Sequence, residues 1–228
     1  MTAKLPLCIF LLLALSIPTA AQIAPGVAEI AAYSGLHAAA AKGDAAEIDR
    51  LAKSGAAIDA RDGFARTPLH VAVYLKQAAA ARALLRLGAD PNALEAQKYD
   101  IVTIAAVADD VPMLKVALEG GCKAGNITSP YEGTALIAAA HLGHDEVVRI
   151  LIAAKAPLDH VNNLGWTALI ESIVLGNGGK RHVNTRDALV KAGANVNLAD
   201  RGGVTPLTLA RTRGYTDMVK ILEKAGAR

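Results

Sequence analysis

The stretch that decides the fold reads Thr67-Pro68-Leu69-His70-Val71-Ala72, followed by Ala83-Leu84-Leu85-Arg86-Leu87-Gly88-Ala89-Asp90-Pro91-Asn92. Threonine caps the start of a helix, and proline takes the first helical position because no backbone donor is needed there. Gly88 can adopt the left-handed conformation that ends a helix, and the Asp, Pro and Asn that follow favour a tight turn. The stretch predicts two short helices followed by a turn.

Two landmarks show that this unit recurs along the chain. One is an apolar residue near the start of the first helix, and the other is the residue that ends the second helix. The first landmark falls at Leu36, Leu69, Val102, Leu136, Leu169 and Leu207, and the second at Gly55, Gly88, Gly121, Lys155, Gly193 and Gly226. Most of the gaps are 33 or 34 residues, so both landmarks indicate a helical repeat protein whose neighbouring units must stack to bury their apolar faces.

Three repeats depart from the pattern. The third has Asp100 where the others have a capping threonine, and Asp100 is expected to cap in its place. The fourth has Lys155 where a glycine is expected to end the helix. The fifth carries five extra residues near 176–182, predicted to form a flexible connection between its helices. This insertion is Gly-rich and then basic, but it lacks the Gly-Lys-Ser/Thr spacing of a phosphate-binding loop.

These residues resemble the ankyrin repeat, and the resemblance covers roughly residues 29–228. It implies an all-α solenoid of about six helix-turn-helix repeats joined by short hairpin-like connections. The repeats would span about 29–62, 63–95, 96–128, 129–161, 162–200 and 201–228. The resemblance also implies a non-enzymatic scaffold without cofactors that binds another protein through the hairpin tips and the concave face of the first helices.

The first 21 residues have the layout of a signal peptide. A basic start with Lys4 precedes an apolar run over residues 5–17, and small residues stand before Gln22. Cleavage is expected after Ala21, or alternatively after Ala20, and residues 22–35 are expected to form an N-terminal cap segment. The apolar run is too short to span a bilayer, so no stable membrane anchor is expected after cleavage. The layout resembles signal-bearing ankyrin proteins of bacterial envelopes and predicts a periplasmic location, with an extracellular one as the alternative.

Composition narrows the possible partners. The formal net charge is only +3, so no nucleic-acid-binding surface is expected. Of the two cysteines, Cys8 lies in the predicted leader, which leaves Cys122 without an internal disulfide partner. Stability must then come from packing, and a monomer is expected.

Aromatic residues mark the candidate partner-binding surface. Four of them precede the first helices of successive repeats by no more than three residues, and stacking would place them in one exposed row able to act as binding hot spots. They are Phe64, Tyr99, Tyr131 and Trp166. Further candidates are Tyr74 and the charged residues Arg66, Lys98, Glu132 and Glu171, which could set charge complementarity. The alternative is that the aromatics pack locally and the charges are simply solvated.

Histidines raise the question of a metal site. His141 and His144 are three residues apart beside Asp145, a spacing close to that of some zinc sites. No remote Cys/His cluster completes such a set, and the resemblance gives His144 and His70 structural positions, so no metal is predicted. No motif pairs a nucleophile with a base. Two other functions stay open, a chaperone-like or inhibitory subunit for an envelope enzyme and a protein that binds a small ligand or metal.

Overall fold

The computed structural model describes residues 22–228. The predicted signal peptide, which ends at Ala21, therefore lies outside the described residues. The described chain contains thirteen α-helices and no β-strand. The helices are α1 Val27–Ala32, α2 Gly35–Lys42, α3 Ala45–Lys53, α4 Pro68–Tyr74, α5 Ala78–Arg86, α6 Ile101–Val107, α7 Val111–Glu119, α8 Ala135–Leu142, α9 Asp145–Ala153, α10 Ala168–Val174, α11 Lys180–Lys191, α12 Pro206–Thr212 and α13 Thr216–Lys224.

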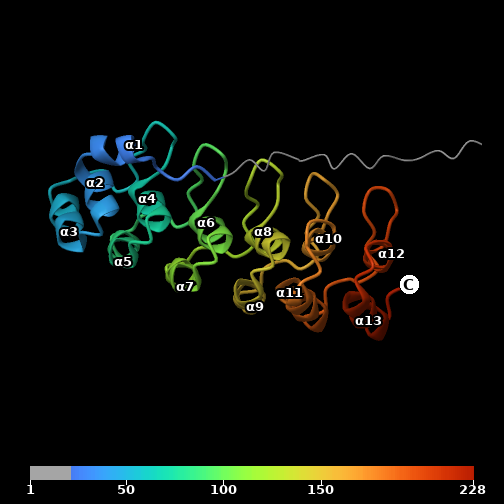
Figure 1. Cartoon of the computed structure of the whole chain (residues 1–228). Helices are drawn as coiled ribbons and strands as arrows, with labels where there is room; N and C mark the ends of the chain where they lie inside the picture. The colour runs from blue at the N-terminus through green and yellow to red at the C-terminus, as the bar shows by residue number, and fades with distance from the viewer. Residues whose placement is uncertain (1–21) are drawn as a thin grey trace, which may run out of the picture.

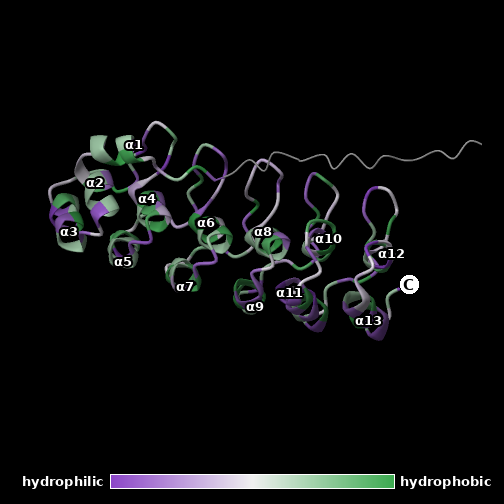
Figure 2. Cartoon of the chain, in the orientation of Figure 1, coloured by the Kyte–Doolittle hydropathy of each residue, from purple (hydrophilic) through white to green (hydrophobic). Residues whose placement is uncertain are grey.

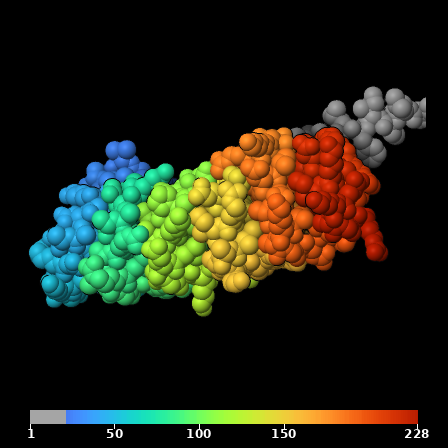
Figure 3. Space-filling model, turned by 90° about the horizontal axis from the view of Figure 1, so that it is seen from below, coloured from blue at the N-terminus to red at the C-terminus, as the bar shows by residue number. Residues whose placement is uncertain are grey.

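The twelve helices from α2 to α13 form six antiparallel pairs that stack into an elongated body. First helices of successive repeats pack side by side, as α8 does against α6 and α10, and second helices form a parallel row, as α9 and α11 do. The connections between repeats project as hairpins beyond the first-helix row (Figure 1). Viewed from below, the repeats follow one another as successive slabs (Figure 3). The predicted all-α solenoid of six helix-turn-helix repeats is confirmed.

Side-chain caps fix where the first helices begin. Thr67 accepts a hydrogen bond from the backbone N–H of His70, and threonines 134, 167 and 205 repeat this contact. In the third repeat Asp100 Oδ1 accepts from the N–H of Thr103 at 2.8 Å, which confirms the predicted replacement cap. The His70 ring bridges the Thr67 hydroxyl, at 2.9 Å, and the carbonyl of Tyr99 in the next repeat, at 3.3 Å. His70 therefore ties two repeats together.

The apolar core lies between the two rows of helices and runs the length of the stack (Figure 2). Small alanines such as Ala72, Ala106 and Ala140 are fully buried on the first helices. They allow close approach, while leucines such as Leu84 and Leu136 fill the space between the rows. Each repeat shares its core with its neighbours.

Left-handed backbone occurs at the same points in each repeat, with or without glycine. Lys155 has a φ of 64°, in the range in which Gly121 and Gly193 end their helices at 93° and 96°. The helix end in the fourth repeat thus keeps its geometry despite the missing glycine, at a conformational cost that glycine avoids.

The insertion in the fifth repeat is not a flexible connection throughout. The structure is helical from Lys180 onward, and α11 has 12 residues where the other second helices have nine. The first turn of α11 is anchored by Arg181, which pairs with Asp109 at 2.8 Å and Asp145 at 3.2 Å. The remaining connection is also held in place, because the Tyr215 hydroxyl donates to the carbonyl of Gly176 at 2.8 Å.

Candidate functional site

The hairpins between repeats form a continuous platform. We call residues 62–66, 95–99, 129–133, 162–166 and 200–204 the hairpin row. Backbone hydrogen bonds join neighbouring hairpins, from Ala96 to Phe64 at 2.9 Å, from Ser129 to Lys98 at 2.8 Å and from Asn163 to Tyr131 at 2.9 Å. These bonds fix the hairpins of the second to fifth repeats relative to one another, so the row presents a preorganised surface.

A polar side chain holds most of these hairpins in shape. Asp62 Oδ1 accepts from the N–H groups of Phe64 and Arg66, both at 2.9 Å. Glu95, Asn162 and Asp200 accept the equivalent pairs of N–H groups in their own hairpins. Each of these residues stands five positions before a helix cap. Sequence reasoning missed them, although this constant offset was a signal that could have revealed them.

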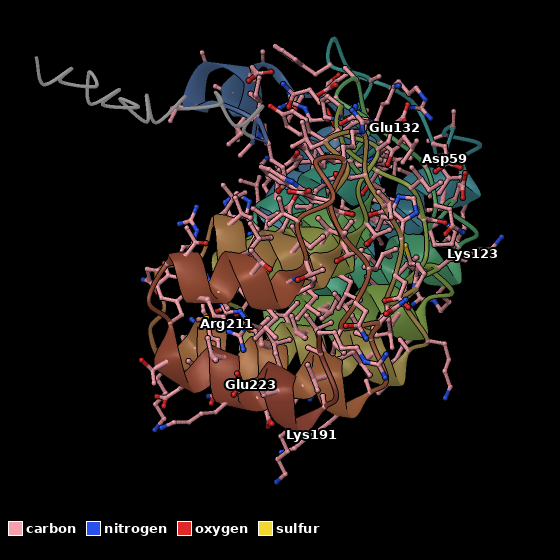
Figure 4. All side chains as sticks on the ribbon, turned by 90° about the vertical axis from the view of Figure 1, so that its right-hand side faces the viewer. Asp59, Lys123, Glu132, Lys191, Arg211 and Glu223 are labelled. Atoms are coloured by element: carbon pink, nitrogen blue, oxygen red, sulfur yellow. The ribbon has the colours of Figure 1, made fainter. Side chains whose placement is uncertain are left out.

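The next-to-last position of every hairpin in the row is left-handed. Its φ is 56° at Ala65, 64° at Lys98 and 54° at Glu132, and glycine occupies it only in the last two hairpins, at Gly165 and Gly203. Lys98 and Glu132 are exposed. Figure 4 places Glu132 among the hairpins at one edge of the molecule and Lys191 of α11 at the opposite edge.

The four predicted aromatics do not form one exposed row. Phe64 and Tyr131 stand three residues before a helix cap, whereas Tyr99 and Trp166 stand one residue before it. Phe64 is 41% exposed and Tyr131 is half-buried, while Tyr99 is only 6% exposed. Burial, followed by nearby Glu95 and Tyr131, raises the pKa of Tyr99. The expectation of exposure is wrong for Tyr99, whereas Trp166, at the same position of its own hairpin, is half-buried.

Arg66 occupies the same position as Tyr99 and is also buried, so it is not the exposed charge that both the predicted partner contact and the solvated alternative require. Its Nε pairs with Asp62 Oδ2 at 2.7 Å, and its Nη2 pairs with Glu29. The guanidinium lies 4.7 Å from the centre of the Phe64 ring. A carboxylate of the same hairpin, Asp62, and one of the N-terminal segment, Glu29, make this burial possible.

Glu171 is buried as well, at 5% exposure, and lies on the first-helix face of the fifth repeat. Asn162 Nδ2 donates to its Oε1 at 2.7 Å, and His141 Nδ1 lies 3.7 Å from its Oε2. Burial raises the pKa of Glu171 to about 7, and the hydrogen bond from Asn162 opposes the rise. Burial also lowers the pKa of His141, with smaller effects from His182 and His144.

The histidines have packing roles in this arrangement. His144 Nδ1 contacts the carbonyl of Ala106 at 2.9 Å, and His182 Nε2 contacts the carbonyl of His141 at 2.9 Å. Within residues 22–228, no group of three or more His, Cys, Asp or Glu side chains is arranged to hold a metal ion.

Tyr74, on α4, is half-buried. Burial raises its pKa, with a further effect from Glu95 and an opposing one from Arg66. Its hydroxyl is buried without a hydrogen-bond partner in the described part of the chain. A buried hydroxyl without a hydrogen-bond partner is costly to stability.

Stacked helix pairs with a preorganised hairpin edge define a class of repeat protein, an α-helical solenoid that presents a long surface. A sequence profile for ankyrin repeats in three copies matches residues 8–95 and 102–200. This chain belongs to the ankyrin-repeat family, whose repeats are generally protein–protein interaction modules and typically non-enzymatic.

Known proteins of several kinds are similar to this chain. The putative ankyrin repeat protein YahD of Escherichia coli is 32% identical over 190 residues, which cover 83% of this chain and 94% of that protein. A crystal structure of an ankyrin repeat domain from Acinetobacter baumannii is 45% identical, with a TM-score of 0.81 over 85% of this chain and 98% of that one. Protein phosphatase 1 regulatory subunit 27 of Mus musculus is 35% identical over 83 residues, covering 36% of this chain and 51% of that protein. Among residues 22–228, no helix has the length and apolar character needed to cross a membrane.

Proposed function

We propose that this chain is a periplasmic scaffold that binds one protein partner through the hairpin row of repeats two to four and the adjacent first-helix face. The observation that carries the proposal is the run of three non-glycine residues, Ala65, Lys98 and Glu132, in left-handed conformation. Left-handed backbone costs a non-glycine residue about 1–2 kcal/mol. Backbone strain of this kind clusters at functional sites, which favours a role for this edge of the hairpin row.

The chemistry of this surface suits a protein partner. Phe64 and Tyr131 offer aromatic area, and Lys98 and Glu132 add one charge of each sign. Rigid aromatics flanked by charges of both signs are typical of protein-binding hot spots and their rims. Because the hairpins are already hydrogen-bonded to one another, little conformational freedom is lost on binding.

Export to the periplasm is supported by the layout of residues 1–21. Mass spectrometry of the mature protein tests this part. A mature chain that begins at Gln22 is expected, and a retained leader would contradict export by this route.

A second candidate function is a regulatory or protective subunit of an envelope enzyme. It is favoured by the likeness to a mouse protein that is named a regulatory subunit of a phosphatase. This function uses the same surface, and it differs in that the partner's activity would change on binding.

Crosslinking and pull-down from the native envelope fraction tests partner binding. The mature chain is compared with a Phe64→Ala/Tyr131→Ala variant, because these two aromatics lie on the open side of the row. The proposal expects one partner in defined stoichiometry with the parent and its loss with the variant, at an almost unchanged Tm. Equal recovery by both proteins would contradict the assigned surface.

A further inference from the structure

The N-terminal segment crosses the base of the second repeat's hairpin. We call residues 22–33 the N-terminal strap, which includes α1. α1 lies above α2, beside the hairpin that precedes α4 (Figure 1). At the C-terminal end of the strap, the Tyr33 hydroxyl donates a hydrogen bond to Asp62 Oδ2 at 2.7 Å. Both ends of the strap therefore contact the same hairpin.

Polar contacts hold the strap, and its apolar contacts are few. α1 has no buried residue, whereas every helix from α2 to α13 has at least one. Val27 is 87% exposed, and Pro25 is the one buried residue of the segment. A helix of six residues is not stable alone in water, so α1 depends on its docking contacts.

Arg66 is the centre of those contacts. Its side chain has no solvent exposure, and two of its three donor groups face the strap. Nη2 pairs with the Glu29 carboxylate, and Nη1 donates to the carbonyl of Ile23 at 3.2 Å. The hydrogen bond from the backbone of Gly26 lowers the pKa of Glu29, and Arg66 lowers it further. A carboxylate and a carbonyl at fixed positions are therefore what this site binds.

We infer that the strap is an internal occupant of a binding site for an acidic peptide segment, and that a partner displaces it. The incoming segment places a carboxylate on Arg66 in place of Glu29 and a carbonyl in place of that of Ile23. This inference rests on the proposed function, because it adds the class of partner and a means of control to the same surface.

The surface beside Arg66 offers a contact that an incoming peptide could use in addition to those of the strap. Phe64 stands beside Arg66 and is still partly exposed. A partner segment that covers the exposed part of Phe64 gains a contact that the strap does not make.

Hydrogen exchange on the full mature chain tests the strap's mode of attachment. Glu29→Gln removes the charge that pairs with Arg66, and Glu47→Gln is the control because Glu47 forms a comparable pair with Arg50 on the exposed face of α3. Glu29→Gln is expected to raise exchange at residues 27–33 by about tenfold or more while α2 to α13 stay protected. The control leaves the strap unchanged. Unchanged exchange in Glu29→Gln, or loss of protection throughout α2 and α4, would overturn the inference.

A peptide experiment tests displacement. An unlabelled synthetic peptide of residues 22–33 is added to isotopically labelled mature chain at about millimolar concentration, since a tethered segment has an effective concentration of that order. The peptide is expected to raise exchange of the protein's own strap by at least twofold, and the same peptide carrying Glu29→Gln is not. If both peptides act alike or neither acts, the site is not selective for a carboxylate. Neither experiment needs the natural partner, so a failure here is distinct from a failure to find one.

Discussion

The side-chain amide of Asn162 donates a 2.7 Å hydrogen bond to Oε1 of Glu171, and both side chains are buried. One residue belongs to the hairpin and the other to the first helix of the same repeat. This contact places a carboxyl group where Val71 and Ile104 stand in the second and third repeats. The fifth repeat thus has a polar interior, and its stability should respond to pH.

Glu171→Gln tests that response. The raised pKa means that the folded protein keeps a proton between about pH 4.5 and 7 that the unfolded chain releases, so Glu171 lowers stability as pH rises through this window. The difference between 4.5 and about 7 corresponds to at most about 3 kcal/mol. The variant should match the parent near pH 4 and exceed its unfolding free energy above pH 7.

Denaturant titrations across this pH range measure the difference. Burial lowers the pKa of His70 to about 4, so His70 makes stability rise with pH between about 4 and 6.5 and opposes Glu171. Comparing variant and parent at each pH removes the contribution of His70. Replacing the exposed Glu146 by Gln is the control. A constant difference between Glu171→Gln and the parent at all pH values would show that Glu171 does not titrate as described.

Arg186→Met should stabilise the protein. Arg186 is fully buried at a position where the preceding repeats have Leu114 and Val148, and its Nε and Nη1 have no hydrogen-bond partner in the described part of the chain. Burial lowers its pKa to about 9, while Tyr215, whose ring centre lies 5.9 Å away, acts in the opposite direction. Replacing even a buried ion pair by apolar residues of similar volume is often neutral or stabilising by about 1–4 kcal/mol, and we expect Arg186→Met to fall on the stabilising side.

Thermal and denaturant unfolding at pH 7 check this gain, with the exposed Arg82→Met as the matched control. The folded-state pKa lies below the ordinary value of 12.5, so the penalty of Arg186 is complete below about pH 9 and declines above it. The advantage of the variant should therefore narrow as the pH rises beyond 9. A variant less stable than the parent would show that the guanidinium is compensated.

Gly176→Ala should destabilise the fifth repeat. A Cβ built on Gly176 would lie 2.1 Å from the carbonyl oxygen of Ser172, so the backbone must shift. We expect a loss of about 2 kcal/mol or more. Gly63→Ala is the control, because a Cβ there meets nothing within 4 Å, and it should change stability by no more than about 0.5 kcal/mol. Equal effects of the two substitutions in urea titrations would rule out this account of the connection.

Periodicity predicted the fold because every repeat carries its own caps and apolar positions. The capping residues Thr67 and Thr205, and Asp100 in place of a capping threonine, were enough to predict where the first helices begin. The burial of Arg66 and Glu171 could not be predicted in this way. Glu29, the partner of Arg66, lies in the N-terminal segment outside the repeats. Asn162 and Glu171 stand at regular positions of their repeat, but other repeats have apolar residues such as Val71 and Ile104 in place of Glu171. The left-handed conformation of Lys98 follows from its register in the hairpin, which becomes visible only when the repeats are superimposed.

Two lysines with left-handed backbone provide the most direct test of the central claim, which is that exposed side chains of the hairpin row bind a partner. Lys98 and Lys155 both have a φ of 64°, but only Lys98 lies in the row. Glycine relieves a strain of about 1–2 kcal/mol and costs roughly 0.5–1 kcal/mol in entropy, so each Lys→Gly change should raise stability by up to about 1.5 kcal/mol.

The decisive measurement is the Kd of the captured partner for Lys98→Gly, Glu132→Gly and Lys155→Gly, taken together with their unfolding free energies. The account predicts that all three variants are at least as stable as the parent, and that only Lys98→Gly and Glu132→Gly bind more weakly, by about fivefold or more. If these two bind as tightly as the parent and Lys155→Gly, the hairpin row of repeats two to four is not the binding surface.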